Sequence, residues 1–316
     1  MIGIGFGNVT STSSLEVPGY PGGVPNNSMA LLDMLSVGAQ SDASHLYSIS
    51  RKLRTAYVGP LINVRRASDG ATTDIGVNGD DVLNYSTLLS FIEAGSGVGS
   101  EVVTITTIYE QSASNNYDLV QVLTARQPIL FDSGTYYNSP TGAFVSYADG
   151  TREMQSSIAT GFSLADFSIF TVNQTNDLAT KQNLFLRAHT NGFISSAVVP
   201  DGVNPTQIVS RVREESGAKT NFYRGDTKSD TDWFRFNVRG SNIPTGVNNA
   251  EYNGTTLGAS SLIPGGSVSN DLHFILSKDN SDYFIGKFSE MMIFSSQISD
   301  VDTDLITNNQ ATFYGT

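Results

Sequence analysis

Short segments rich in β-branched and aromatic residues recur along most of this chain, and they constrain its fold more than any other feature. Examples are "LINVRR", "VVTITTIY", "FSIFTVN", "WFRFNVR" and "KFSEMMIFS", with Gly, Asn, Asp or Pro in the stretches between them. Such residues favour extended backbone, and the intervening residues favour turns. Many short strands without helices between them are typical of an antiparallel sandwich or barrel. The sequence therefore predicts an all-β protein.

Three helices are expected beside the strands. The first covers residues 42–57, the second follows Asn84 and stops at Gly95, and the third begins at Ser299 or Asp300. Aspartates in the first turn of the third helix suit the helix dipole. In each of the first two helices, apolar residues at helical spacing form an inward face. The face of the first helix consists of Leu46, Ile49, Leu53 and Tyr57, and that of the second of Leu88, Leu89 and Ile92.

Composition excludes several classes of function. The formal net charge of -12 argues against nucleic acid as the main partner, because phosphate binding needs clustered cations. The sequence has no cysteine, which excludes disulfides and thiolate catalysis. No apolar run is long enough for a membrane span, and the start lacks the features of a signal peptide. We expect one large domain over residues 28–316.

The first 27 residues differ from the rest. Gly, Ser, Pro and Asn dominate them, and "VPGYPGGVPNNS" is rich in turn-forming residues. We expect an extended assembly arm that a neighbouring subunit orders; the alternative is a short strand along the parent domain. The apolar residues available for such contacts are Ile2, Ile4, Phe6 and Tyr20.

A small group of cations stands out in this acidic chain, within "LYSISRKLRTAYVGPLINVRRASDGATTDIG". We expect Arg51 and Arg54 on the exposed side of the first helix, and Arg65 and Arg66 at the end of a strand. Local pairing with carboxylates would orient these side chains and add little stability. A functional patch is the alternative. The carboxylates available for pairing are Asp69, Asp74, Asp80 and Asp81.

This stretch, followed by "VTITTIYEQSASNNYDLVQ", resembles the start of the α-L-arabinofuranosidase B catalytic domain, with a Tyr-x-Gly-Pro turn, a basic strand, Ser-Asp-Gly and a segment like Tyr-Asp-Gln-Ser. The later segment "HFILSKDNSDYFIGKFSEMMIFSSQISDVD" resembles the last strands of the laminin-G or concanavalin type. The resemblance implies a concanavalin/laminin-G-like jelly-roll β-sandwich with a few short helices and an extended N-terminal arm.

The same N-terminal module is similar to one found in virion proteins of tailed bacteriophages, which often begin with a Gly-rich arm such as "MIGIGFGN". That resemblance implies a non-enzymatic virion structural protein, either a capsid decoration or head fibre or a tail component. Its implied partners are other virion proteins, reached through the arm, further copies of the chain, and host surface glycans.

The resemblance also identifies catalytic positions. A retaining glycosidase needs a nucleophile and an acid/base about 5 Å apart. The resemblance places Asp279 of "KDNSD" at the acid/base and Thr190 of "HTNGFI" at the nucleophile, and Glu110 stands where the family has Asp. Because Thr190 carries no carboxyl group, we predict no catalytic site, with Asp279 as the residue to test. The alternatives are a carbohydrate-binding protein and an arabinofuranosidase-like hydrolase.

Other side chains give further candidate sites. Tyr223 and Trp233 lie in an aromatic region that could stack on a sugar, although aromatic strand residues also fill cores. Asp279 and Asp282 could bind calcium, as could "DVDTD"; the alternatives are a hairpin turn and a helix start. We expect no other cofactor. Remaining carboxylates and histidines are Glu214, Glu215, Glu251, Glu290, His45, His189 and His273, the histidines without metal-ligand spacing.

Overall fold

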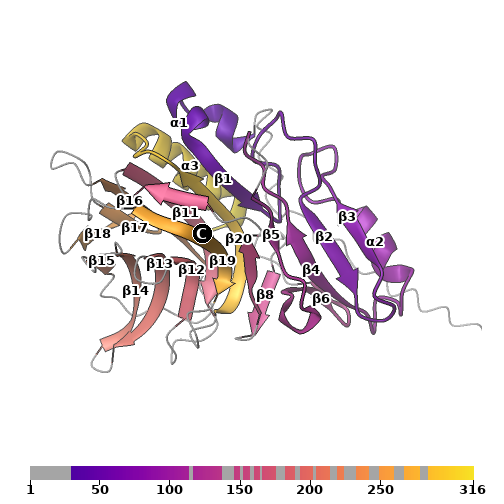
Figure 1. Ribbon diagram of the computed structural model, residues 1–316. Coiled ribbons are helices and arrows are strands. Elements are labelled where there is room, and N and C mark those ends of the chain that lie inside the picture. The colour runs from indigo at the N-terminus through magenta and orange to yellow at the C-terminus, as the bar shows by residue number, and fades with distance from the viewer. Residues whose placement is uncertain are drawn as a thin grey trace, which may run out of the picture.

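A computed structural model gives the architecture of the chain (Figure 1). The residues whose backbone it describes are 30–113, 117–136, 146–149, 152–156, 160–163, 166–175, 182–188, 193–201, 204–213, 219–223, 233–241, 249–259, 267–277 and 284–316. The residues whose side chains it describes are 30–113, 117–135, 152–155, 166–175, 233–240, 249–257 and 284–316. The predicted arm, residues 1–27, lies outside both sets.

Two antiparallel sheets form a β-sandwich, as the sequence predicts. The first has the order β17–β16–β11–β20–β1, and each strand pairs antiparallel with its neighbour. Side chains on both faces of its central strands are buried, because the second sheet and a helix cover them. The strands are β1 (Ala43–Ser48), β11 (Asp166–Thr175), β16 (Trp233–Ser241), β17 (Asn249–Tyr252) and β20 (Ile285–Phe294).

The second sheet has the order β15–β14–β13–β12–β19, again antiparallel. Strand β18 pairs with both β17 and β15 and so joins the two sheets at one side of the sandwich. Strands β9 and β10 pair with β19. The bounds are β9 (Met154–Ser156), β10 (Thr160–Ser163), β12 (Gln182–Ala188), β13 (Phe193–Asp201), β14 (Asn204–Arg213), β15 (Lys219–Tyr223), β18 (Thr255–Ala259) and β19 (Ser267–Ser277).

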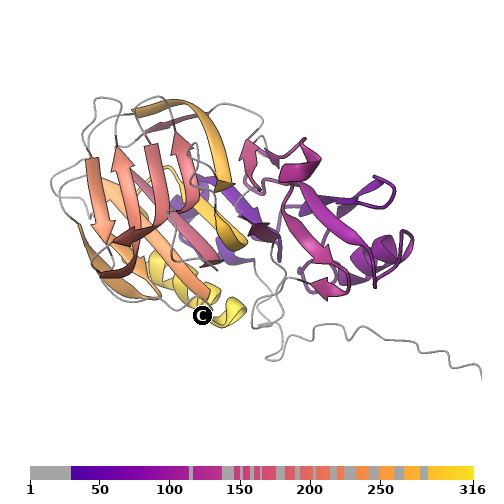
Figure 2. The ribbon, with the colours of Figure 1, turned by 90° about the horizontal axis from the view of Figure 1, so that it is seen from below.

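A smaller N-terminal layer stands beside the sandwich (Figures 1 and 2). Its order is β3–β2–β4–β6, with β5 next to β4 and with β7 and β8 next to β6. The pairs β5–β9 and β8–β20 link it to the sandwich. The bounds are β2 (Ile62–Arg66), β3 (Thr72–Ile75), β4 (Val102–Ile108), β5 (Leu119–Val120), β6 (Ile129–Asp132), β7 (Thr135–Tyr136) and β8 (Ser146–Asp149).

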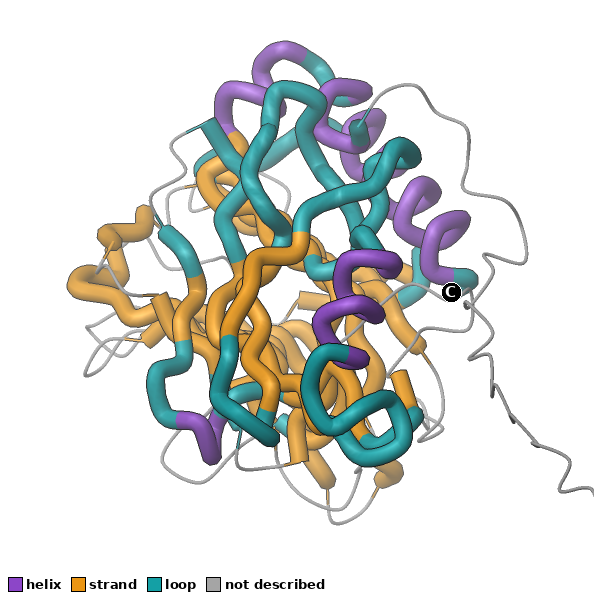
Figure 3. The backbone as a smooth tube through the Cα atoms, turned by 90° about the vertical axis from the view of Figure 1, so that its right-hand side faces the viewer, coloured by secondary structure: helices purple, strands orange, loops and turns teal. Residues whose placement is uncertain are grey.

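Two of the three predicted helices are confirmed. Helix α2 (Tyr85–Glu93) begins after Asn84, whose side chain accepts from the backbone N–H of Thr87; Figure 3 shows the side of the molecule on which it lies. Helix α3 (Asp300–Tyr314) is capped by Ser299 and ends at Gly315, whose φ of 68° suits glycine. The short helical elements are η1 (Leu31–Met34), α1 (Val37–Asp42) and η2 (Thr124–Arg126).

The helix predicted over residues 42–57 is wrong. Residues Ala43–Ser48 form β1, which pairs with β20, and an irregular segment follows. Leu46 and Tyr47 are adjacent and both fully buried, which a strand achieves when both of its faces are covered. The apolar spacing that looks helical therefore combines a doubly covered strand with buried residues of a loop.

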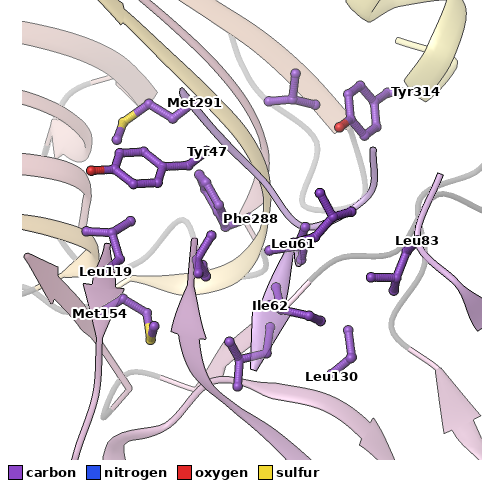
Figure 4. Close-up of a cluster of buried hydrophobic side chains, with 14 of the residues drawn as sticks. Tyr47, Leu61, Ile62, Leu83, Leu119, Leu130, Met154, Phe288, Met291 and Tyr314 are labelled. Atoms are coloured by element: carbon purple, nitrogen blue, oxygen red, sulfur yellow. The ribbon is translucent and has the colours of Figure 1, made fainter. Parts of the chain in front are cut away.

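The main hydrophobic cluster contains side chains from both the N-terminal layer and the sandwich. Figure 4 shows Tyr47, Leu119, Met154 and Met291 close together within it. A second cluster lies under α3 and η1 and includes Phe170 and several aliphatic residues. The two layers thus share one core. Among the described helices, none has both the length and the apolar character that a membrane crossing needs.

Candidate functional site

Most of the residues predicted for a site lie outside the described side chains. Tyr223 is placed by its backbone alone: it is the last residue of β15 and pairs with Val209 and Gly258. His273 pairs with Arg187 in β19 and β12. The predicted residues outside the described backbone are Ile2, Ile4, Phe6, Tyr20, His189, Thr190, Glu214, Glu215, Asp279 and Asp282.

Trp233 opens β16 with its ring in the main hydrophobic cluster and 7% of the residue exposed. The ammonium group of Lys287 lies 5.7 Å from the ring centroid, and burial lowers the pKa of Lys287. Trp233 and Lys287 both pair with Gln174 of β11, so the three form one row across the sheet. The ring therefore has a packing role in the core; sugar stacking by Trp233 stays a prediction.

The segments with Thr190 and Asp279 follow the C-terminal ends of β12 and β19, and the strand register gives the positions of these two ends. Strand β12 ends at Ala188, which pairs with Leu272 of β19. Strand β19 ends at Ser277, which pairs with Asn183 near the start of β12. At about 3.3 Å per residue these two levels are roughly 17 Å apart. The chain enters the segment with Thr190 at the first level and the segment with Asp279 at the second.

Arg51 is buried rather than exposed, which corrects its predicted place on a helix surface. Its guanidinium donates to Glu290 through Nε at 2.8 Å and Nη2 at 3.1 Å, and through Nη1 to Asn309 at 2.6 Å. Gln310 and Tyr314 of α3 also donate to Glu290. Burial alone would lower the pKa of Arg51, but its interactions with Glu290 and Tyr314 together outweigh burial and raise that pKa. These hydrogen bonds connect α3 to β20 and to the loop after β1.

The motifs that carry the resemblance have structural roles. Arg66 donates to Asp69 at 2.7 Å and to the carbonyl of Phe91 at 2.7 Å, which confirms one of the predicted local pairs. Tyr57 donates to the carbonyl of Pro60 at 2.5 Å across the Tyr-x-Gly-Pro turn. Gly70, with φ of 75°, completes the Ser-Asp-Gly turn. These residues fix the loops of the N-terminal layer.

Glu110 and Gln111 close the free edge of β1. The Glu110 carboxylate accepts from the backbone N–H groups of Leu46 at 3.0 Å and Ser112 at 2.6 Å, and Gln111 N–H donates to the carbonyl of Leu46 at 2.9 Å. Burial raises the pKa of Glu110, while the hydrogen bonds from Ser112 oppose that rise. The motif thus occupies edge groups that a further strand would otherwise pair with.

Glu101 is a buried carboxylate that sequence reasoning missed. Its Oε1 accepts from the backbone N–H groups of Ala67 and Ser68, and its Oε2 from the N–H and Oγ of Ser96 and from the Oγ of Ser68. Burial raises its pKa, but these hydrogen bonds outweigh burial and lower the pKa to about 2. Glycine at position 95 leaves room for the Glu101 carboxylate, because a Cβ atom there would lie 2.2 Å from Oε2 of Glu101. Glu101 thus connects the turn after β2 with the segment after α2 through hydrogen bonds.

Two other predicted residues also have packing or pairing roles. Glu251 accepts from Nδ2 of Asn237 at 2.9 Å and lies 3.9 Å from Nη2 of Arg239. His45 is 3% exposed and its ring lies 4.8 Å from that of Tyr117. Within the described part of the chain, no group of three His, Cys, Asp or Glu side chains could hold a metal ion. Calcium binding by Asp279 and Asp282 stays a prediction.

Comparison with known proteins finds a family model that matches part of the chain and solved structures that are similar over most of it. Residues 35–162 match the family model "Alpha-L-arabinofuranosidase B, catalytic". The structure is similar to an arabinofuranosidase complexed with arabinofuranosyl-α-1,2-xylobiose, at 14% identity and TM-score 0.61, over 90% of this chain and 65% of that one. It is also similar to a GH54 α-L-arabinofuranosidase soaked with a cyclic sulfate inhibitor, at 14% identity and TM-score 0.58, over 90% and 66% of the two chains. A search of curated sequences finds no match.

These matches correct one prediction. The sequence predicts a non-enzymatic chain because Thr190 replaces the nucleophile, yet the matching model describes a catalytic domain and the similar structures are arabinofuranosidases. The arabinofuranosidase resemblance and the β-sandwich fold are confirmed. This chain spans about two thirds of the length of those structures, 65% and 66%. The likeness at 14% identity shows the fold, and the activity is a proposal.

Proposed function

We propose that this chain is an arabinofuranosidase-type glycoside hydrolase domain that acts on terminal arabinofuranosyl groups. The observation that carries the proposal is the match of a catalytic-domain model to residues 35–162, which include the whole N-terminal layer and β9. The fold similarity over 90% of the chain supports it. One of the similar proteins holds arabinofuranosyl-α-1,2-xylobiose, which supplies the substrate class.

The resemblance assigns the acid/base role to Asp279. Hydrolysis with retention needs a second carboxyl group about 5 Å away. Thr190 has none, and the ends of β12 and β19 are separated, so the second carboxyl must come from elsewhere. Asp149 is our candidate, because its backbone pairs with Ile285, the first residue of β20 after the segment that carries Asp279.

The test follows arabinose released from arabinofuranosyl-α-1,2-xylobiose by the full chain. We expect Asp279→Asn to lower the rate by about 100-fold, because a positioned acid/base contributes at least that factor. Asp149→Asn is expected to do the same, whereas Asp201→Asn, at the end of β13, serves as the control. Sugar binding without any release of arabinose would contradict hydrolysis and leave a carbohydrate-binding domain; neither binding nor release would contradict the whole proposal.

The virion setting is a proposal about location and partners. It comes from the resemblance to phage virion proteins, which implies assembly through residues 1–27 and through further copies of the chain. A virion-borne hydrolase domain is compatible with both resemblances. We expect deletion of residues 1–27 to abolish incorporation into particles while arabinofuranoside binding is retained. Unchanged incorporation, measured by immunoblotting of purified particles, would contradict the role of the arm.

A further inference from the structure

An uncharged tip projects from the loop between β5 and β6. We call residues Val122, Leu123, Thr124 and Ala125 the 122–125 tip; all four are exposed. Val122 is 80% exposed and Leu123 is 55% exposed. Two large exposed apolar side chains next to each other indicate a binding surface, because contiguous apolar patches mark such surfaces more often than isolated apolar residues do.

The loop beneath the tip is fixed by two buried amides. Leu123 donates its N–H to Oε1 of Gln121 at 2.9 Å, and Gln127 donates from Nε2 to the carbonyl of Gln121 at 2.9 Å. Arg126 N–H donates to the carbonyl of Leu123 at 2.8 Å and closes η2. Gln121 and Gln127 are 4% and 3% exposed. The tip is therefore held in place before any ligand arrives.

The same loop is tied to β9. Gln121 donates from Nε2 to the carbonyl of Glu153 at 3.2 Å, and Glu153 N–H donates to the carbonyl of Arg126 at 3.0 Å. The guanidinium of Arg126 also pairs with the Glu153 carboxylate at 2.7 Å. Three polar contacts thus connect the loop of the tip to Glu153, the residue before β9.

The register of β9 against β19 places Glu153 near the C-terminal end of β19, after which the chain continues to Asp279. Met154 pairs with Ile275, and the strands are antiparallel. Glu153 therefore lies on the side of this pair toward Ser277, the last residue of β19. From Ser277 the chain enters the segment that carries Asp279. The tip thus stands beside the strand end that leads to the proposed acid/base.

We infer that the 122–125 tip contacts the sugar unit to which the arabinofuranosyl group is attached, an inference that rests on the proposed hydrolase function. Sugar rings present apolar C–H faces, and apolar walls with few polar groups are usual in ligand sites. The tip carries no charge on a chain with net charge -12, which suits a neutral glycan better than a charged protein. Val122 and Leu123 are therefore specificity residues that touch the aglycone.

The experiment compares two ligands by isothermal titration calorimetry, with every protein carrying Asp279→Asn so that cleavage is slow and binding is measured at equilibrium; Asp279→Asn alone is the reference. Arabinofuranosyl-α-1,2-xylobiose has a sugar aglycone, whereas methyl α-L-arabinofuranoside has none. In the double variant Val122→Ser, Leu123→Ser we expect the Kd of the first ligand to rise about tenfold, because the serine side chains bury less apolar area against the sugar. The Kd of the second ligand should not change. Val58→Ser is the matched control, since Val58 is 97% exposed on the Tyr57–Pro60 turn.

Each other outcome overturns the inference. Equal Kd values for the first ligand in the Asp279→Asn reference and in the variant would show that the tip makes no sugar contact. Weaker binding of both ligands would place the tip at the arabinofuranosyl group instead. Loss of self-association in size-exclusion chromatography, with Kd values unchanged, would identify a protein contact. If the Asp279→Asn reference binds neither ligand, the proposed function itself fails, which the titration of the reference alone reveals.

Discussion

Replacing Glu290 with alanine is expected to lower the free energy of unfolding by about 3–5 kcal/mol, the usual cost of removing one partner of a buried ion pair. Glu290 is fully buried and accepts hydrogen bonds from Arg51, Gln310 and Tyr314. The substitution leaves the Arg51 guanidinium, 8% exposed at its side chain, without a carboxylate. Urea unfolding at pH 7 measures the loss.

The control is an ion pair between Lys52, from the same loop as Arg51, and a half-exposed carboxylate. Lys52 and Asp81 are 2.6 Å apart, but the Asp81 side chain is 49% exposed. We expect Asp81→Asn to cost less than about 1 kcal/mol, as exposed pairs generally do. A second variant, Arg51→Met with Glu290→Leu, removes both charges of this buried pair, so it should lose less stability than Glu290→Ala alone. Equal losses in all three variants would contradict the role assigned to this buried pair.

Replacing Glu101 with glutamine is expected to cost about 3 kcal/mol, because hydrogen bonds to a charged acceptor are strong and unsatisfied donors are costly. Both carboxylate oxygens accept backbone N–H groups, Oε1 from Ala67 and Ser68 and Oε2 from Ser96. The side-chain amide of Gln has only one acceptor oxygen, so its NH₂ group would face an N–H donor. Thermal unfolding near pH 7 measures the effect.

The stability that Glu101 contributes depends on pH. Its pKa is about 2 in the folded protein, against 4.5 ordinarily. Because the folded pKa is depressed, the contribution is complete above about pH 4.5 and is lost as pH falls toward 2. The difference in stability between wild type and Glu101→Gln should therefore shrink over that interval. Glu93→Gln, at an exposed helix end, is the control; a difference that persists at pH 2 would contradict the assignment.

Local signals predicted local structure well. Asn84 and Ser299 cap α2 and α3 as expected, because capping depends on a few neighbouring residues. The alternating segments became strands, since their pattern matches a pleated sheet. The prediction of a helix over residues 42–57 was wrong because the structure there depends on contacts distant in the sequence. Both faces of β1 are covered by distant parts of the chain, and no local pattern reports that.

Ion pairs could likewise be predicted from the sequence only where the two residues are close in the chain. Arg66 and Asp69 are three residues apart, and their contact could be predicted. Arg51 and Glu290 are 239 residues apart, and only the fold brings them together. Glu101 gave no signal beyond an acidic residue among serines and glycines. The candidate site was predicted through resemblance alone, because Asp279 and Thr190 are far apart in the sequence and no spacing between them indicates whether they share a site.

The most direct test of the central claim is calorimetric titration of the Asp279→Asn variant with arabinofuranosyl-α-1,2-xylobiose and, separately, with xylobiose. The substitution is expected to slow cleavage while it keeps the sugar site, so binding can be measured at equilibrium. We predict saturable binding of the arabinofuranosylated ligand and none of xylobiose at the same concentrations. Equal binding of both ligands, or of neither, would contradict the proposal that this chain recognises arabinofuranosyl groups.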